Sequence, residues 1–292
     1  MSQNTYTLLD CGDGRRLEAF GPLIVDRPAP DADLPRRDPG RWADAVTYRA
    51  GRGWAAAGGG AIRDTSVILE LGGVVMTVEL AAGGQLGIFP EHVINAEWLS
   101  DMIGRRNARD ADPPEILNLF AYTGLLSLVA AVAGARVAHV DASRPAVRWA
   151  RRNAEASGLA GRPFRWLVDD ALAFARREAR RGRRYAGIIL DPPSYGHGGR
   201  RGHGGAWRFD AGIDELLRAC RAIAEPDAFW LLTTHTPGWG PNRLAATLAG
   251  AIGAAARVDP VEGRHLELTA ASGAVLGLGS AARCDPMSPN SR

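Results

Sequence analysis

Lysine is absent from this chain: all 35 basic residues among its 292 are arginine. A P-loop needs a lysine beside its phosphate-binding glycines, so the chain excludes that way of holding a nucleotide. Arginine presents a planar fork of donors, which binds phosphate groups and stacks on nucleobases. Because 32 acidic residues balance the arginines, the formal net charge is only +3, although the sequence pI is about 9.0.

Cysteine and long apolar runs are scarce as well. Cys11, Cys220 and Cys284 lack the spacing of a metal site, and their odd number argues against a disulfide framework. The longest apolar run, residues 125–134, is too short to span a bilayer. The first residues lack the basic start and apolar core of a signal peptide. We therefore expect a cytoplasmic protein with reduced thiols, no metal centre and no membrane partner.

The hydrophobic content of 46% supports a sizeable core, and the pattern within it changes along the chain. The first hundred residues carry short β-like segments, and Gly72-Gly73 is typical of a hairpin turn. We expect strands at 6–9, 17–25, 46–49, 65–71 and 74–80, followed by a helix at 90–106. This part is predicted to be a β-rich module over residues 1–100.

From Glu115 onward, strand-like runs alternate with helical ones, which indicates a parallel sheet. The expected strands are 115–119, 136–141, 163–168, 186–191 and 228–234, and the helices are 124–134, 144–157, 170–182, 211–224 and 241–253. A closing hairpin is expected from 264–270 and 273–279. We assign residues 101–284 to this domain and 285–292 to a disordered tail rich in Pro and Ser.

The end of the first strand of this domain carries a candidate cofactor site. A turn there leads into a helix, so free backbone amides meet a ligand at the helix N-terminus. Gly124 permits close approach of the backbone, but the segment is no GxGxxG fingerprint, which disfavours a dinucleotide. The candidate cofactor-binding residues are Asn118, Phe120, Ala121, Tyr122, Thr123 and Gly124.

Acidic residues end the next two strands. Asp141 comes about twenty residues after the first turn, where a carboxylate accepts hydrogen bonds from ribose hydroxyls. The alternative is that Asp141 caps the following helix, with Ser143 as a competing cap and a further cofactor-binding candidate. At the third strand end we assign Asp170 to an adenine amino group and Asp169 to the helix cap.

The strand 186–190 ends in Asp191-Pro192-Pro193-Ser194-Tyr195. Two prolines fix the backbone and remove two donors, so the carbonyls are placed to accept from a planar amino or imino group. Tyr195 can stack on a base, and such a site suits a base taken out of its stack. We take Asp191, Pro192, Pro193 and Tyr195 as catalytic candidates, with Asp191 also touching the cofactor.

Three further features of the sequence each allow two interpretations. The Gly-rich segment 196–205, with Arg200 and Arg201, is either a loop that closes over phosphates or a mobile loop without function. His235 follows a strand and is either a base or a structural residue. A dense arginine cluster is either an RNA-facing patch or a solvated helical face; its members are Arg176, Arg177, Arg180, Arg181, Arg183 and Arg184.

With these motifs, residues 65–280 resemble the bacterial class I S-adenosylmethionine (SAM)-dependent methyltransferases of large-subunit ribosomal RNA, which include cytosine-C5 and guanine-N7 enzymes. The segment Gln85–His92 is similar to the family's passage from a β-rich domain into the catalytic domain. The resemblance implies an α/β fold, with a Rossmann-like sheet after a small β-rich domain. It also implies that Phe120, Tyr122 and Gly124 line the methionine part of SAM.

Two departures from the family narrow the expected chemistry. Cytosine-C5 members carry a cysteine in the strand-end motif where this chain has Thr234-His235-Thr236, and C5 transfer needs a thiolate to attack the ring first. An RNA-binding PUA domain, which some members carry N-terminally, is not expected here. We therefore predict direct methylation of a base nitrogen in ribosomal (23S) RNA. The alternatives are a methyltransferase of proteins or small molecules, and a non-catalytic RNA-binding module.

Overall fold

The computed structural model describes residues 5–60, 62, 66–196, 207–253, 256 and 258–286. The rest, including most of the Gly-rich segment and the predicted tail after residue 286, lies outside this description. The chain divides into two compact units, Met1–Val93 with Leu266–Leu278, and Ile94–His265 with Gly279–Arg292. The sequence placed the boundary at residue 100, a position inside helix α1 (Val93–Arg109). No helix within the described ranges has the length and apolar character to cross a membrane.

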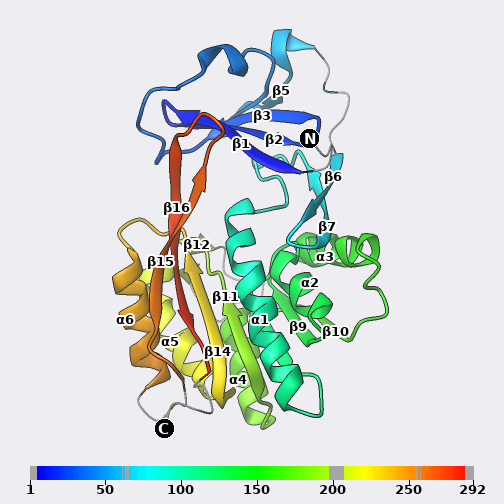
Figure 1. Ribbon diagram of the computed structural model, residues 1–292, viewed down its shortest axis with the longest axis vertical. Helices are drawn as coiled ribbons and strands as arrows, with labels where there is room; N and C mark the ends of the chain where they lie inside the picture. The colour runs from blue at the N-terminus through cyan, green and yellow to red at the C-terminus, as the bar shows by residue number, and fades with distance from the viewer. Residues whose placement is uncertain are drawn as a thin grey trace. The chain divides into compact units, whose positions relative to one another are not determined.

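The first unit is β-rich, as predicted. Its strands are β1 (Tyr6–Gly12), β2 (Arg15–Phe20), β3 (Leu23–Pro28), β4 (Val46–Arg49), β5 (Gly53–Ala55), β6 (Ser66–Leu71) and β7 (Val74–Glu79). The first five form one sheet in chain order, and β6 pairs with β7 (Figure 1). The single strand expected over 17–25 is wrong, because Gly21 turns the chain with a φ of 58° between β2 and β3.

The second unit is built on a seven-stranded sheet in the order β10-β9-β8-β11-β14-β16-β15. Its strands are β8 (Glu115–Leu119), β9 (Arg136–Asp141), β10 (Phe164–Val168), β11 (Tyr185–Leu190), β14 (Ala224–Thr234), β15 (Glu262–Thr269) and β16 (Val275–Cys284). The first five in spatial order are parallel, and β16 runs antiparallel to β14. The prediction that the last strand ends at residue 279 is wrong, because residues 280–284 continue along β14.

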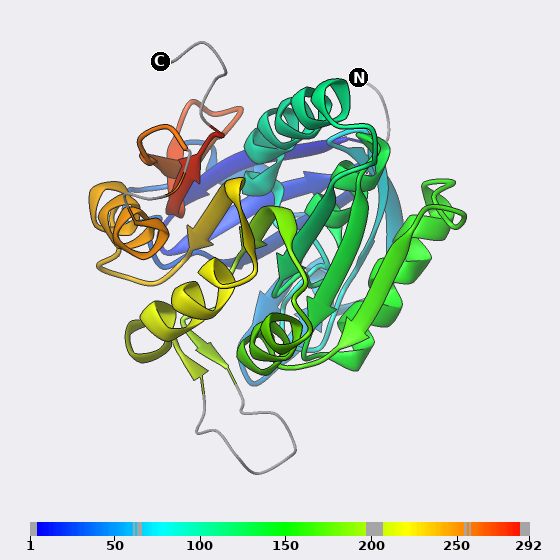
Figure 2. The same cartoon turned by 90° about the horizontal axis from the view of Figure 1, so that it is seen from below.

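Helices cover both faces of this sheet. They are α1, α2 (Leu125–Val132), α3 (Arg144–Ala156), α4 (Ala171–Arg180), α5 (Phe209–Arg221) and α6 (Pro241–Ile252). Figure 2 shows α4 and α5 on the face opposite α1. All six residues of β11 are buried, as expected for a central parallel strand. The fold class predicted from the sequence, a Rossmann-like sheet with a β-rich N-terminal part, is confirmed.

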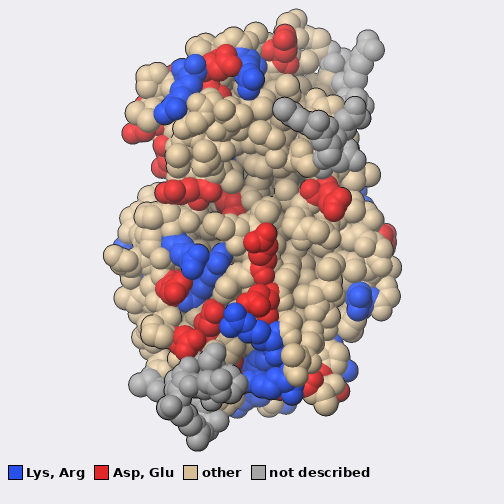
Figure 3. Space-filling view, in the orientation of Figure 1, with Lys and Arg blue, Asp and Glu red and all other residues tan. Residues whose placement is uncertain are grey.

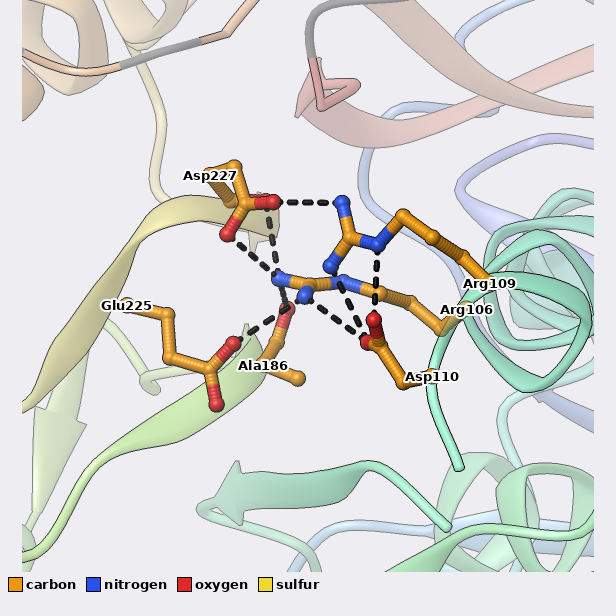
Figure 4. Close-up of polar contacts among 6 residues, drawn as sticks. All are labelled: Arg106, Arg109, Asp110, Ala186, Glu225 and Asp227. Carbon is orange, nitrogen blue, oxygen red and sulfur yellow. Dashed lines mark hydrogen bonds and ion pairs between the residues drawn. The ribbon is translucent and has the colours of Figure 1, made fainter. Parts of the chain in front are cut away.

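A buried arginine joins α1 to the starts of two central strands (Figure 4). Arg106 is 3% exposed and donates to the backbone oxygens of Ala186 and Asp227, at 3.4 and 3.0 Å. It also forms ion pairs with Glu225 and Asp227, both at 3.0 Å. A buried guanidinium needs such partners, since an unpaired buried charge is very costly. This network fixes the sheet at the end remote from the predicted site.

Candidate active site

Two strand-end turns face the same edge of the sheet, because β8 and β11 are parallel neighbours with Leu119 paired to Leu190. We call residues 120–124, after β8, the cofactor turn, and residues 191–195, after β11, the acceptor turn. Ligands of open α/β sheets bind at this carboxyl edge. The two strand ends that carry the candidate motifs therefore lie side by side, as expected from the sequence.

The cofactor turn has an unusual backbone. Phe120 and Tyr122 have positive φ values of 57° and 49°, and among the described residues only one other non-glycine, Asp13, does so. Gly124 has a φ of 96°, and a Cβ added there would lie 3.1 Å from the Cβ of Ala150. Left-handed aromatic residues cost energy and persist only where neighbouring contacts impose them. Such backbones concentrate at ligand sites, so the strain supports the predicted cofactor role.

Hydrogen bonds from β9, from α3 and within the turn itself hold this backbone. The amide of Ala121 donates to the Val140 carbonyl at 3.1 Å, and the amide of Gly124 donates to the Ala121 carbonyl at 3.0 Å. From α3, the side-chain amide of Asn153 donates to the Thr123 carbonyl at 3.0 Å. Gly124 is the N-cap of α2 and brings no side chain to cap the first amides. The first turn of α2 therefore offers backbone donors to an anionic group.

A chain of buried polar side chains lies beneath the cofactor turn. Asn118 donates to the hydroxyl of Ser127 at 2.9 Å, and that oxygen lies 3.0 Å from Nδ1 of His139. Burial lowers the pKa of His139 to about 3, so the ring is neutral at physiological pH. Asn118 is 3% exposed and its amide is engaged inside the protein. Asn118 supports the cofactor turn from below through Ser127, and its own contact with the cofactor stays a prediction.

The Asp141 carboxylate is held at the end of β9 by two backbone amides. Tyr122 donates to its Oδ2 at 2.8 Å and Ser143 to its Oδ1 at 2.7 Å. Burial raises the pKa of Asp141, and these two hydrogen bonds oppose that rise only in part. Ser143, not Asp141, caps α3, with its hydroxyl accepting from the Ala146 amide at 3.3 Å. Asp141 is therefore oriented as an acceptor beside the cofactor turn, and its alternative role as a cap is wrong.

The cap of α4 is made by Asp170, so the prediction that Asp169 is the cap is wrong. Asp170 is the N-cap of α4, with Oδ1 accepting from the Ala173 amide at 2.9 Å. Asp169, predicted to be the cap, accepts from the Asp170 amide and forms an ion pair with Arg177. No described residue donates to Oδ2 of Asp170, whereas both oxygens of Asp169 are engaged. One oxygen of Asp170 is therefore left without a protein donor, and its assignment to an adenine amino group stays a prediction.

Side chains at the end of β14 and in the two residues after it surround the acceptor turn. The hydroxyl of Thr233 donates to Oδ1 of Asp191 at 2.6 Å. Nε2 of His235 lies 3.8 Å from the same oxygen. The hydroxyls of Ser194 and Thr236 are 3.0 Å apart. Sequence reasoning singled out His235 in this motif and missed Thr233, although its position at the end of β14 was the available signal.

Trp207 connects the two turns and was not anticipated. It lies on β13 (Trp207–Arg208), which pairs with β12 (Tyr195–Gly196). Its indole N–H donates to the Pro193 carbonyl at 2.7 Å, and its ring centroid is 5.4 Å from that of Phe120. One carbonyl assigned to the base is thus engaged within the protein. Tyr195 remains 72% exposed, with the Arg208 guanidinium 5.8 Å from its ring centroid.

The arginine cluster around α4 is largely neutralised. Four of its six members form ion pairs: Arg176 with Glu215, Arg177 with Asp169, Arg181 with Glu178 and Arg183 with Glu115. Figure 3 shows the same intermixing on another face, where basic and acidic side chains adjoin along α1. The structure therefore favours the solvated face over the RNA patch for this cluster.

No thiolate is available at the acceptor turn. Cys220 and Cys284, the two cysteines of the second unit, are both 0% exposed. Burial raises the pKa of both thiols. A buried thiol with a raised pKa is inert as a nucleophile.

The sheet order, the strained turn after β8 and the carboxylate at the end of β9 define an α/β enzyme of the class I methyltransferase type. A solved structure of a SAM-dependent methyltransferase from Agrobacterium tumefaciens superposes with a TM-score of 0.87 at 32% identity, over 98% of this chain and 92% of that one. The chain belongs to the SAM-dependent methyltransferases. Its cofactor is therefore SAM, as predicted.

The other comparisons show less, either because the sequence identity is low or because the match covers only part of the chain. The structure of SMU.776 complexed with SAH has a TM-score of 0.75 over 98% of this chain and 76% of that one, but its 17% identity shows the fold alone. The large-subunit ribosomal RNA methyltransferase K/L of Shewanella frigidimarina is 30% identical over 139 residues, 47% of this chain. Methyltransferase I of the same subunit from Aeromonas salmonicida is 29% identical over 169 residues, 57% of this chain. These matches span only 18% and 37% of those relatives, and no family model matches the chain.

Proposed function

We propose that this enzyme methylates a base nitrogen of large-subunit ribosomal RNA by direct transfer from SAM. Both curated relatives are named for methylation of that RNA. The observation that carries the proposal is the acceptor turn, in which Asp191, held by Thr233, lies beside the cofactor turn at the carboxyl edge of the sheet. A rigid carboxylate and proline carbonyls suit the N–H groups of a planar base.

The residues of the cofactor turn fit SAM. The uncapped amides at the start of α2 suit a carboxylate, and Asp141 offers acceptors that suit ribose hydroxyls. The glycine at position 124 lets the turn pack closely on α3, where a Cβ would lie 3.1 Å from that of Ala150. We assign the methionine part to Phe120, Tyr122 and Gly124, the ribose to Asp141 and the adenine amino group to Asp170. Ala121, Thr123 and Ser143 shape the site through the backbone and the α3 cap.

The chemistry asked of the chain is orientation more than proton transfer. The SAM sulfonium supplies an activated methyl group. Asp191 holds the amino or imino group of the base and takes up the proton that this nitrogen loses as the N–CH3 bond forms and the sulfonium S–CH3 bond breaks. The exposed ring of Tyr195 stacks on the base plane. The hydroxyl of Thr233 keeps Oδ1 of Asp191 in one place, so less reorganisation is needed at the moment of transfer.

The thiol positions favour nitrogen over carbon as the acceptor atom. Methylation at cytosine C5 proceeds through attack of a thiolate on the ring. Cys220 and Cys284 are buried in the core of the catalytic unit, in α5 and β16. Neither can reach a base, whereas a ring or exocyclic nitrogen carries its own lone pair and needs no covalent intermediate.

The test is methyl transfer from radiolabelled SAM to total RNA and to total protein from a strain that lacks the gene. Label in large-subunit ribosomal RNA, in a nucleoside methylated on nitrogen, is the expected result. Label confined to protein or small molecules would mean that one of these, and not RNA, is the methyl acceptor. RNA binding with neither transfer nor SAM binding would contradict an enzymatic role.

We place the protein in the cytoplasm, where ribosomal RNA is found. Its three cysteines are free and buried, which fits a reducing compartment. Fractionation of the cell, followed by detection of the protein with a tag, tests this placement. Recovery with the membrane or an extracellular fraction would contradict it.

A further inference from the structure

Helix α3 carries arginines that differ from those of α4 in one respect. Arg144, Arg148, Arg151 and Arg152 are all exposed. Within the described part of the chain, no carboxylate forms an ion pair with Arg144, Arg148 or Arg151. Glu155 is the one acidic residue of α3, and it forms no ion pair with those three arginines. The charges of these three arginines are therefore not neutralised by ion pairs, in contrast to those of four arginines on and beside α4.

The arginines of α3 form a continuous stripe. Positions 144, 148 and 151 are separated by four and three residues, so they share one face of the helix and rise about 10 Å along it. The opposite face, with Ala146, Ala150 and Asn153, is buried against the sheet. A row of outward guanidinium groups at this spacing matches a phosphate chain better than it matches a single small anion.

Aromatic rings lie beside this stripe. The Arg151 guanidinium is 6.0 Å from the ring centroid of Trp166, and that of Arg152 is 5.8 Å from Trp149. On the edge strand β10, Phe164 and Trp166 stack with centroids 4.5 Å apart, and both are only half-buried. Figure 1 shows α3 beside the edge of the sheet that β10 forms. Positive charge along a backbone track with half-exposed aromatic rings is the composition of surfaces that bind single-stranded nucleic acid.

The stripe is physically tied to the active site. Ser143, at the start of α3, donates its amide to Asp141, and Asn153 holds the Thr123 carbonyl of the cofactor turn. Trp149 lies 6.4 Å, centroid to centroid, from Tyr122 of that turn. A polyanion lying on α3 therefore passes close to the place where the methyl group is delivered.

From these observations we propose that α3 and β10 form the RNA-docking face of the catalytic unit and take an unpaired RNA segment flanking the modified base. Arg144, Arg148 and Arg151 bind its phosphates, and Trp166 with Phe164 supports a base. The inference rests on the proposed function, because it takes RNA as the acceptor. It moves the predicted arginine contact from α4 to α3.

The test compares two triple variants of the full-length protein. One carries Arg144→Gln, Arg148→Gln and Arg151→Gln; the matched control carries Arg176→Gln, Arg181→Gln and Arg183→Gln on and beside α4. Binding of a fluorescently labelled single-stranded RNA oligonucleotide is followed by anisotropy over a series of salt concentrations. We expect the α3 variant to lose roughly a hundredfold in affinity near 0.1 M salt, and its log–log salt slope to fall by about 2. The control variant is expected to stay near the wild type.

SAM affinity and circular dichroism establish that both variants are folded. Wild-type binding by the α3 variant, or an equal loss in the control, would overturn the proposal while leaving RNA methylation intact. Equal binding of polyglutamate, with the same dependence on these arginines, would overturn the assignment to RNA. If the wild-type protein binds SAM but no RNA, both this inference and the proposed acceptor fail.

Discussion

The cofactor turn and the acceptor turn lie on neighbouring strands but are held in different ways. In the cofactor turn, the Val140 carbonyl and the side chains of Asp141 and Asn153 hold the turn's own amides and carbonyls, with left-handed φ values at Phe120 and Tyr122. In the acceptor turn, two prolines set the backbone, while the hydroxyl of Thr233 and the indole of Trp207 hold its polar groups. The cofactor turn is therefore held mainly at its main-chain groups, and the acceptor turn mainly at its side chains.

This difference has a physical consequence for how each turn tolerates change. The main-chain groups of the cofactor turn are present whatever its own side chains are, so the turn keeps one shape for an invariable ligand such as SAM when those side chains are substituted. Contacts made by side chains change with every substitution, so the acceptor turn can be adapted to different acceptors without disturbing the cofactor. Substitutions in the acceptor turn are expected to alter transfer, and those around the cofactor turn to alter SAM binding.

The largest expected effect is at Asp191. Asp191→Ala removes the carboxylate that orients the base, so kcat should fall roughly 10²–10³-fold, the usual cost of one well-placed polar group. The SAM dissociation constant, measured by calorimetry, should change little because the cofactor turn is held independently. Full activity in this variant would show that the acceptor turn has been misassigned, and a large loss of SAM affinity would abolish the distinction between the turns.

The next effect is the converse, at Asp141. Asp141→Ala should weaken SAM binding by about 1.5–3 kcal/mol, the value of hydrogen bonds to a charged group. Binding of the RNA substrate should be unchanged. Asp214→Ala, an exposed aspartate of α5, is the matched control. Unchanged SAM affinity in Asp141→Ala would remove Asp141 from the ribose site.

The sequence predicted the parallel half of the sheet and both turns because their signals are local. Apolar runs ending in Asp141 or Asp191, each followed by a helix or a proline turn, need no knowledge of distant residues. The same reasoning missed β5, β12 and β13, which are two or three residues long and lack periodicity. It also ended β16 too early, because the final residues of that strand are specified by pairing with β14.

The site details that sequence reasoning missed depend on partners far along the chain. In the sequence, Trp207 is an isolated aromatic residue after a glycine-rich segment. Its contacts with Phe120 and Pro193 are visible only in the folded structure. The density of arginines on α4 suggested a patch, yet partners such as Glu215 and Glu115 come from other elements. Local charge density therefore says little about net surface charge.

A smaller effect tests whether side chains hold the acceptor turn. Thr233→Val keeps the shape of this 1% exposed side chain and removes the donor to Asp191. We expect kcat to fall about tenfold, as for the loss of one hydrogen bond to a charged group, with SAM affinity unchanged. Thr247→Val on the exposed face of α6 is the control. An unaltered kcat would mean that the prolines alone fix Asp191.

The smallest effect concerns the polar chain beneath the cofactor turn. Burial lowers the pKa of His139 to about 3, below its ordinary value of 6.5. The unfolded chain then binds a proton that the folded chain does not, so this contribution to stability is present above pH 6.5 and declines as the pH falls toward 3. The expected loss is about 0.8 kcal/mol at pH 6 relative to pH 8. His139→Gln should remove this loss from denaturant unfolding curves, whereas His265→Gln, at an exposed position, should retain it. An identical pH dependence in His139→Gln and the wild type would mean that the imidazole takes up its proton within the folded protein, and that the support beneath the cofactor turn is less rigid than the turn itself.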